Sequence, residues 1–121
     1  MTYALDPELV TVMDALAELS RNTPRPRRGG WQALRDSGNA GQAYLATLVP
    51  PSSGVHIDAF VATAADGVSL ELRWYTTDTA GAGSAVVYAH GGGMILGSID
   101  LYDELLSWYV GQTGVPFLAV A

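Results

Sequence analysis

The N-terminal part of the chain carries apolar side chains at the spacing of an α-helix. Asp6 and Pro7 suit an N-cap and a first helical turn, and apolar residues then recur every three or four positions. These residues are Leu9, Val12, Met13, Leu16 and Leu19. The pattern predicts an amphipathic helix from about residue 7 to 20.

A second helix is expected over residues 31–48, after a linker rich in arginine and proline. Gly38 and Gly41 weaken this prediction, because glycine inside a helix costs about 1 kcal/mol relative to alanine. The sequence PPSSG at 50–54 then ends the segment. Residues 1–50 are therefore expected to form a helical region of their own.

From Val55 onward the apolar residues alternate with polar ones, which is the period of a β-strand. Residues 55–61 and 68–74 both show this alternation, and Asp66-Gly67 between them is a turn signal. The segment is predicted to form a β-hairpin.

The last part of the chain predicts a strand, a glycine-rich loop, a helix and a second strand. AVVYAH at 85–90 and PFLAVA at 116–121 are short apolar runs typical of buried strands. Residues 99–110 between them show helical spacing, with Asp100 and Asp103 near the helix N-terminus, where acids are favourable. Because a crossover of this kind joins parallel strands, residues 55–121 are expected to form a mixed sheet in an α/β fold.

Composition and charge argue against several classes of function. The net charge is −6 and lysine is absent, so the chain lacks the cations that nucleic-acid binding requires. The absence of cysteine rules out disulfides and thiolate catalysis, and the two histidines are too few for a three-histidine metal site. We expect no metal and no cofactor. Arginines within 21–28 are interpreted as part of a solvated linker, with an anionic partner as the alternative.

The sequence also bears on location. It has no run of eighteen apolar residues, so no membrane span is predicted. Its start, MTYALDPELV, lacks the basic region and apolar stretch of a secretory signal, so a cytoplasmic location is expected.

The segment AHGGGMILGS at 89–98 is the strongest candidate for chemistry. The dinucleotide pattern G-x-G-x-x-G fails because Leu96 stands at its sixth position, and Ser98 replaces the lysine of a phosphate-binding P-loop. A loop that presents backbone N–H groups to an oxyanion fits, because only glycine lets a substrate carbonyl approach such donors closely. A tight strand-to-helix turn without chemistry is the alternative.

With HGGG after a strand, the chain resembles the N-terminal portion of the hormone-sensitive-lipase-like branch of the α/β-hydrolase esterases and lipases. The two predicted helices resemble the cap of that family, and GVPFLAVA resembles its fourth strand. The resemblance implies a helical cap region at 1–50. Residues 55–121 would be the first four strands and first helix of an incomplete α/β-hydrolase domain.

The resemblance also implies roles for individual residues. The oxyanion donors would be the N–H groups of Gly92 and Gly93, and His90 would orient the loop without being the catalytic base. A set of apolar residues, with the cap helices, would shape an acyl pocket: Met94, Ile95 and Leu96. Met94 and Tyr102 depart from the aromatic residue and the histidine common at those positions in the family. His56 is expected on the protein surface.

The chain carries no recognisable nucleophile, since none of its serines lies in a G-x-S-x-G motif. We therefore expect the N-terminal portion of a serine carboxylic-ester hydrolase acting on a small acyl ester, inactive as the 121-residue chain alone. The alternatives are a non-enzymatic binding module, one half of a split hydrolase, or a partial chain without a role of its own. By the resemblance, residues 116–121 lie inside the sheet and 85–90 at its edge, where we expect self-association or binding of a complementary chain.

Overall fold

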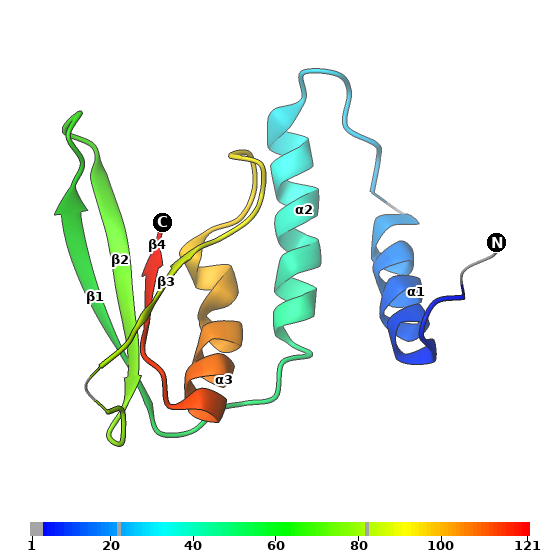
Figure 1. The fold of residues 1–121 in the computed structure, drawn as a ribbon. Helices are drawn as coiled ribbons and strands as arrows, with labels where there is room; N and C mark the ends of the chain where they lie inside the picture. The colour runs from blue at the N-terminus through cyan, green and yellow to red at the C-terminus, as the bar shows by residue number, and fades with distance from the viewer. Residues whose placement is uncertain (1–3, 22, 82) are drawn as a thin grey trace.

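The computed structural model describes residues 4–21, 23–81 and 83–121, and its elements follow the predicted order (Figure 1). Two helices come first, then two strands, and finally a strand, a helical segment and a last strand. In chain order they are α1 (Pro7–Arg21), α2 (Trp31–Ala46), β1 (Val55–Thr63), β2 (Ser69–Thr77), β3 (Val86–Ala89), the 3-10 turn η1 (Ile99–Tyr102), α3 (Asp103–Thr113) and β4 (Phe117–Val120). The one refinement is that the helix predicted from residue 99 begins as a 3-10 turn.

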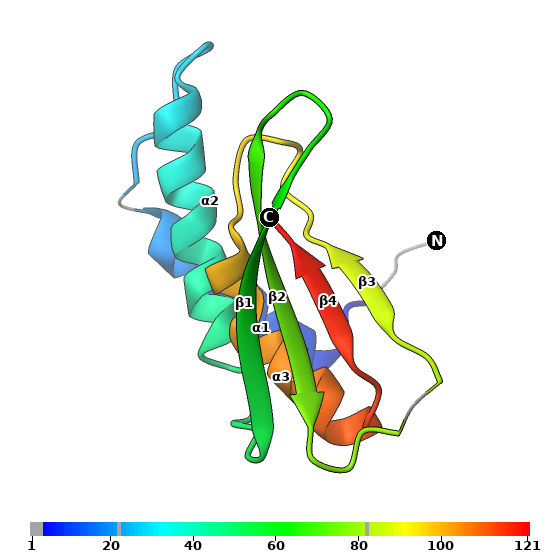
Figure 2. The ribbon, with the colours of Figure 1, turned by 90° about the vertical axis from the view of Figure 1, so that its left-hand side faces the viewer.

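The four strands form a single mixed sheet in the order β1-β2-β4-β3 (Figure 2). β1 pairs antiparallel with β2, β2 pairs antiparallel with β4, and β3 pairs parallel with β4. The last strand in the sequence therefore lies between β2 and β3, and β3 is at the edge. The predicted hairpin, the parallel crossover and the strand order are all confirmed.

The hairpin turn between β1 and β2 has the chemistry that its sequence predicts. The N–H of Val68 donates to Oδ1 of Asp66 at 3.1 Å, and Gly67 takes the positive φ of +87° that favours glycine. This turn sets the register in which Ala62 faces Leu70 and Phe60 faces Leu72.

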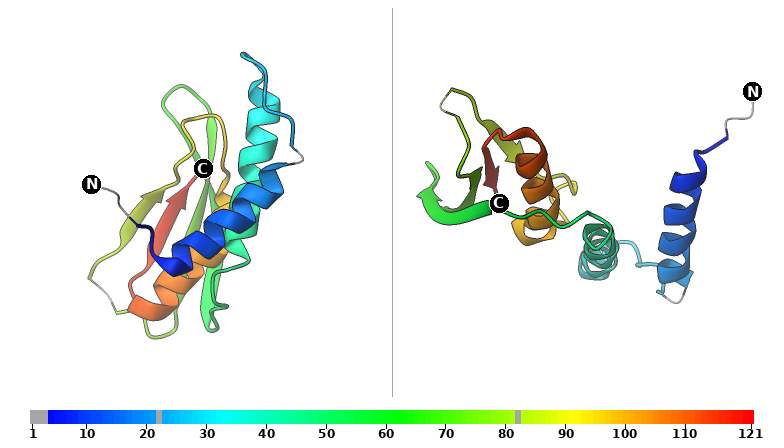
Figure 3. Two further views of the ribbon diagram at one scale, coloured as in Figure 1. Left: turned by 90° about the vertical axis from the view of Figure 1, so that its right-hand side faces the viewer. Right: turned by 90° about the horizontal axis from the view of Figure 1, so that it is seen from below.

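The helices lie in layers on one side of the sheet (Figures 1 and 3). α3 lies against the sheet, α2 lies beyond it beside the start of the α3 segment, and α1 is outermost. In the part of the chain that the structure describes, no helix covers the opposite face of the sheet. Parallel strands normally have cover on both faces, so this sheet is half covered.

The core lies between α3 and the strands β2 and β4. Its buried members are Tyr75, Ile99, Leu106, Val110 and Ala119. Leu106 and Val110 are one helical turn apart, so both point from α3 toward the sheet. Gly114 caps the end of α3: its φ is +67° and its N–H donates to the carbonyl of Val110 at 2.8 Å, a left-handed cap that glycine adopts without strain. Neither α1 nor α2 has a buried residue.

Candidate functional site

The glycine-rich loop joins the carboxyl end of β3 to η1 and reaches toward α2 (Figure 1). Within it, φ is +137° at Gly92, +59° at Gly93 and +60° at Met94. The carbonyl oxygen of Gly92 accepts hydrogen bonds from the N–H groups of Ile95 and Leu96, each at 3.1 Å. The loop is therefore a tight turn closed on the Gly92 carbonyl.

Glycine is required at particular positions of this turn for different reasons. A Cβ on Gly92 would lie 1.9 Å from the carbonyl oxygen of Leu96, and one on Gly97 would lie 2.7 Å from Nδ1 of His90. A Cβ on Gly93 would meet no heavy atom within 4 Å, so only its positive φ favours glycine there. The space beside Gly93 is open, as a ligand that approaches the backbone would need.

The ring of His90 is held between the loop and the start of the helical segment. Its Nδ1 lies 2.7 Å from the carbonyl oxygen of Gly91. Because that oxygen can only accept, Nδ1 must carry the proton. The ring also stacks on Tyr102, with centroids 5.5 Å apart and planes 19° apart. The hydroxyl of Tyr102 in turn accepts a hydrogen bond from Nε2 of Gln42 on α2 at 2.7 Å.

The three apolar residues after HGGG lie in different surroundings. Met94 is fully exposed. Ile95 lines an open hollow of about 390 Å³ with Trp31 and Leu34, whereas the side chain of Leu96 lies against Gly38 of α2. The described residues do not bring the three side chains together in one pocket.

His56 lies on β1, at the opposite edge of the sheet from β3. Its side chain is more than half exposed, and Nε2 lies 2.9 Å from Oδ1 of Asp78. The surface position predicted for this histidine is confirmed.

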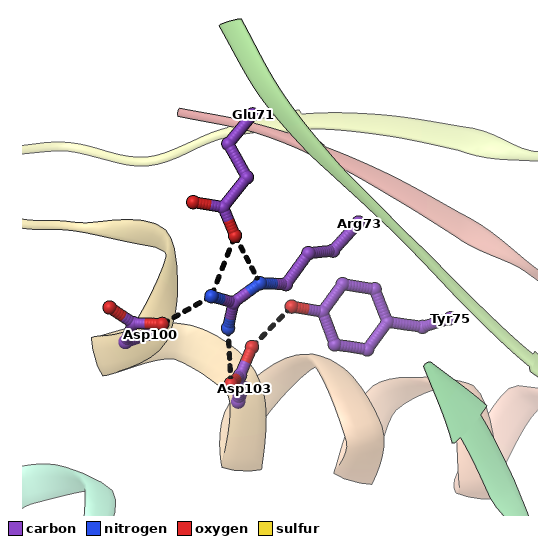
Figure 4. A network of polar contacts seen from close by, with 5 residues as sticks. All are labelled: Glu71, Arg73, Tyr75, Asp100 and Asp103. Carbon is purple, nitrogen blue, oxygen red and sulfur yellow. Dashed lines mark hydrogen bonds and ion pairs between the residues drawn. The ribbon is translucent and has the colours of Figure 1, made fainter. Parts of the chain in front are cut away.

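A polar network at the base of the loop was not predicted from the sequence (Figure 4). Arg73 on β2 donates through Nη1 to Oδ2 of Asp103 at 2.6 Å and pairs through Nη2 with Oε1 of Glu71 at 2.7 Å. The same guanidinium pairs with Asp100 of η1, and the hydroxyl of Tyr75 donates to Oδ1 of Asp103. The network thus ties β2 to the segment that follows the glycine loop.

The environment of the network changes the acid–base properties of two of its members. Burial alone would lower the pKa of Arg73, but hydrogen bonds to Asp100, Glu71 and Asp103 raise it overall, so the guanidinium stays charged. Burial raises the pKa of Tyr75, and its hydrogen bond to Asp103 raises that pKa further. One feature of the sequence could have revealed the network: Glu71, Arg73 and Tyr75 are two residues apart on a predicted strand, so they share one face of it.

We compared the sequence and the structure of the chain with those of known proteins. No sequence-family model matches the chain. An ethyl acetate hydrolase of Pseudomonas putida is 45% identical over 62 residues, which are 48% of this chain and 19% of that protein. The structure of the hyperthermophilic esterase from the archaeon Pyrobaculum calidifontis matches with a TM-score of 0.74 at 22% identity, over 98% of this chain and 36% of that one.

Two further solved structures agree with that match. One is an esterase from the bacterial hormone-sensitive lipase family, with a TM-score of 0.64 and 21% identity over 98% of this chain and 35% of that one. The other is a thermostable carboxylesterase cloned from a metagenomic library, with a TM-score of 0.61 and 26% identity over 74% of this chain and 30% of that one. The chain has the fold of the N-terminal part of an α/β-hydrolase. The resemblance to hormone-sensitive-lipase-like esterases is thereby confirmed.

The chain spans about a third of the length of the solved structures above, which it covers to between 30% and 36%. None of its serines lies in G-x-S-x-G, the motif that carries the nucleophile in α/β-hydrolases. Its described residues contain no cluster of three or more histidine or acidic side chains that could hold a metal ion. None of its described helices is long and apolar enough to cross a membrane.

Proposed function

We propose that this chain supplies the oxyanion-binding loop of a serine carboxylic-ester hydrolase acting on small acyl esters. The observation that carries the proposal is the turn at Gly92 and Gly93, placed at the carboxyl end of β3 with open space beside Gly93. Within the described residues neither N–H group donates a hydrogen bond to another backbone group, which supports a role as donors to a ligand.

In the proposed reaction, a serine from a G-x-S-x-G segment attacks the ester carbonyl and forms a tetrahedral intermediate. The N–H groups of Gly92 and Gly93 donate to the negatively charged oxygen of that intermediate. The loss of one such donor typically costs about 2.7–4 kcal/mol of transition-state stabilisation. His90 keeps the loop in shape through its contacts with Gly91 and Tyr102.

We assign fewer residues to the acyl pocket than the sequence suggests. Of the three apolar residues after HGGG, Ile95 is the one beside the hollow that Trp31 and Leu34 also line. We propose that this hollow, next to the loop, takes part of the acyl group, with linker residues 26–30 and the start of α2 forming its wall. The cytoplasmic location and the division into a cap at 1–50 and a sheet domain at 55–121 also remain proposals.

The loop assignment is tested in a longer chain that carries a G-x-S-x-G segment after these residues. Gly93→Val should lower kcat for a chromogenic acetate ester by two orders of magnitude or more, whereas His56→Ala should leave it unchanged. Equal losses at the two positions would show that the loop is not the site.

The 121-residue chain itself should not hydrolyse the same ester above background. Donors without a positioned nucleophile have no acyl transfer to accelerate. Saturable turnover, or stoichiometric labelling of a serine by a phosphonate, would contradict this.

A second candidate is one half of a split hydrolase, or a module that binds another chain without catalysis. The edge position of β3 favours it, because that strand offers unpaired backbone groups to a partner. Co-expression with a chain that carries G-x-S-x-G distinguishes a split enzyme from a binding module. Activity restored in trans indicates a split enzyme, and binding without activity indicates a binding module.

A further inference from the structure

One face of helix α2 contacts the glycine loop and the turn that follows it. Arg35, Asn39 and Gln42 are spaced four and three residues apart, so they project from the same side of the helix. The loop and the turn that follows it lie against that side.

Each of the three side chains bonds to a different part of this segment. Arg35 donates through Nε to the carbonyl oxygen of Ile95. Oδ1 of Asn39 accepts the backbone N–H of Gly97 at 2.8 Å. Further along, Gln42 donates to the hydroxyl of Tyr102, on which His90 stacks.

Gly38 makes this close approach possible. A Cβ at this position would lie 2.6 Å from Cδ2 of Leu96, so only glycine leaves room for the leucine as it now lies. One of the two glycines that weaken α2 as an isolated helix is thus the residue that lets α2 lie against the loop.

We propose that this face of α2 sets the conformation of the glycine loop, with Asn39 as the positioning residue for the N–H groups of Gly92 and Gly93. The catalytic consequence rests on the oxyanion role proposed above. The physical contact does not, and it can be tested alone.

The reason lies in how the turn is anchored. Ile95 and Leu96 are bonded to the Gly92 carbonyl on one side, and Gly97, the next residue, is bonded to Asn39 on the other. His90 is fixed to Tyr102 at the start of the loop. The peptide groups of Gly92 and Gly93 lie between these two anchors, so their direction depends on both.

Of the two α2 side chains that bond to the loop itself, Asn39 is the one whose loss should matter more. Its hydrogen bond to Gly97 is partly buried, whereas the Arg35 bond to Ile95 is exposed and water can replace it. A partly buried N–H that loses its acceptor is poorly compensated, so the loop should rearrange when Asn39 is truncated.

The experiment is amide hydrogen exchange followed by NMR on the 121-residue chain. Asn39→Ala should speed the exchange of the Gly97 N–H about tenfold or more. Asn39→Asp, which keeps an acceptor oxygen, should restore slow exchange, and Gln32→Ala, an exposed change on the same helix, should leave it unaltered. Alanine is a better helix former than asparagine, so faster exchange in Asn39→Ala would not come from a weaker α2.

Two outcomes of that measurement overturn the contact. One is equal exchange in Asn39→Ala and the wild-type chain. The other is a wild-type Gly97 N–H that exchanges as fast as in a peptide of residues 89–99.

The catalytic half is measured in a longer chain that carries G-x-S-x-G. Asn39→Ala should lower kcat at least tenfold with little change in KM, and Asn39→Asp should recover it. If exchange changes as expected and kcat does not, Asn39 does not position the donors. If Gly93→Val also leaves kcat unchanged, the oxyanion function itself is wrong.

Discussion

Nη1 of Arg73 donates to Oδ2 of Asp103 at 2.6 Å, across the space between β2 and the first turn of α3 (Figure 4). The same guanidinium also pairs with Glu71 and Asp100. One cation therefore faces three carboxylates. The arginine charge offsets the repulsion among these carboxylates, at the point where the chain leaves the glycine loop.

The first prediction concerns this arginine. Arg73→Met keeps much of the aliphatic length but removes the charge, leaving the three carboxylates to repel one another. We expect a loss of about 1–3 kcal/mol in the free energy of unfolding. Arg73 is largely buried but its carboxylate partners are partly to mostly exposed, so the loss should lie between that of a buried and that of an exposed ion pair. Urea unfolding measures it.

The matched control is Arg21→Met. Arg21 pairs with Glu18 on the surface of α1, with both side chains more than half exposed. Exposed pairs contribute little, so the change should stay within about 1 kcal/mol. Similar losses in the two variants would mean that the network does not hold β2 to α3.

The second prediction is a dependence of stability on alkaline pH. The raised pKa of Tyr75 means that the fold favours the neutral hydroxyl. This contribution is fully present below the unfolded-state pKa of about 10 and is lost as pH rises toward the higher folded-state pKa. The free energy of unfolding should therefore fall above pH 10 more steeply in the wild-type chain than in Tyr75→Phe. Parallel curves for the two proteins would contradict the assignment.

The sequence predicted the elements well because each depends on local periodicity. The helix at 7–20 follows from apolar residues every three or four positions, and the hairpin from apolar residues at every second position. The parallel crossover follows from the order strand, helix, strand. The insertion of β4 between β2 and β3 came from the family resemblance, since no local pattern encodes strand order.

The contacts around the site could not be predicted in the same way, because they join residues far apart in the sequence. Arg73 meets Asp103 thirty residues later, and Asn39 meets Gly97 fifty-eight residues later. From the sequence alone, Gly38 only weakened the predicted helix, and its role becomes clear from the position of the Leu96 side chain. Met94, Ile95 and Leu96 are adjacent in sequence, but the irregular turn sends them into different surroundings.

The third prediction uses the two glycines inside α2. Replacing glycine by alanine in a helix normally stabilises it by about 0.5–1 kcal/mol. A Cβ at Gly41 would lie 3.9 Å from Leu16, an ordinary contact, so Gly41→Ala should give this gain. At Gly38 the leucine must move, which should cancel much of the gain. Thermal unfolding compares the two variants, and equal gains would show that α2 does not lie against Leu96 in solution.

The last prediction concerns the open edge of the sheet. β3 pairs with β4 on one side only, and the exposed fractions of its Val86 and Val87 are 38% and 70%. An uncharged apolar strand with unpaired backbone groups is a template for pairing with another chain, and natural proteins seldom leave one bare. We therefore expect the 121-residue chain to self-associate through residues 85–90, or to bind a complementary chain there.

A charge placed on that edge should prevent the association, because a lysine cannot be buried against a second apolar strand without a large desolvation cost. Val87→Lys should shift sedimentation across a concentration series toward the monomer. Val61→Lys is the matched control, since Val61 is 74% exposed and lies on β1 at the other edge. The Val61→Lys variant should associate as strongly as the wild-type chain does. A wild-type chain that stays monomeric at every concentration and binds no complementary chain, or a Val61→Lys variant that dissociates while Val87→Lys does not, would show that β3 is not the contact edge.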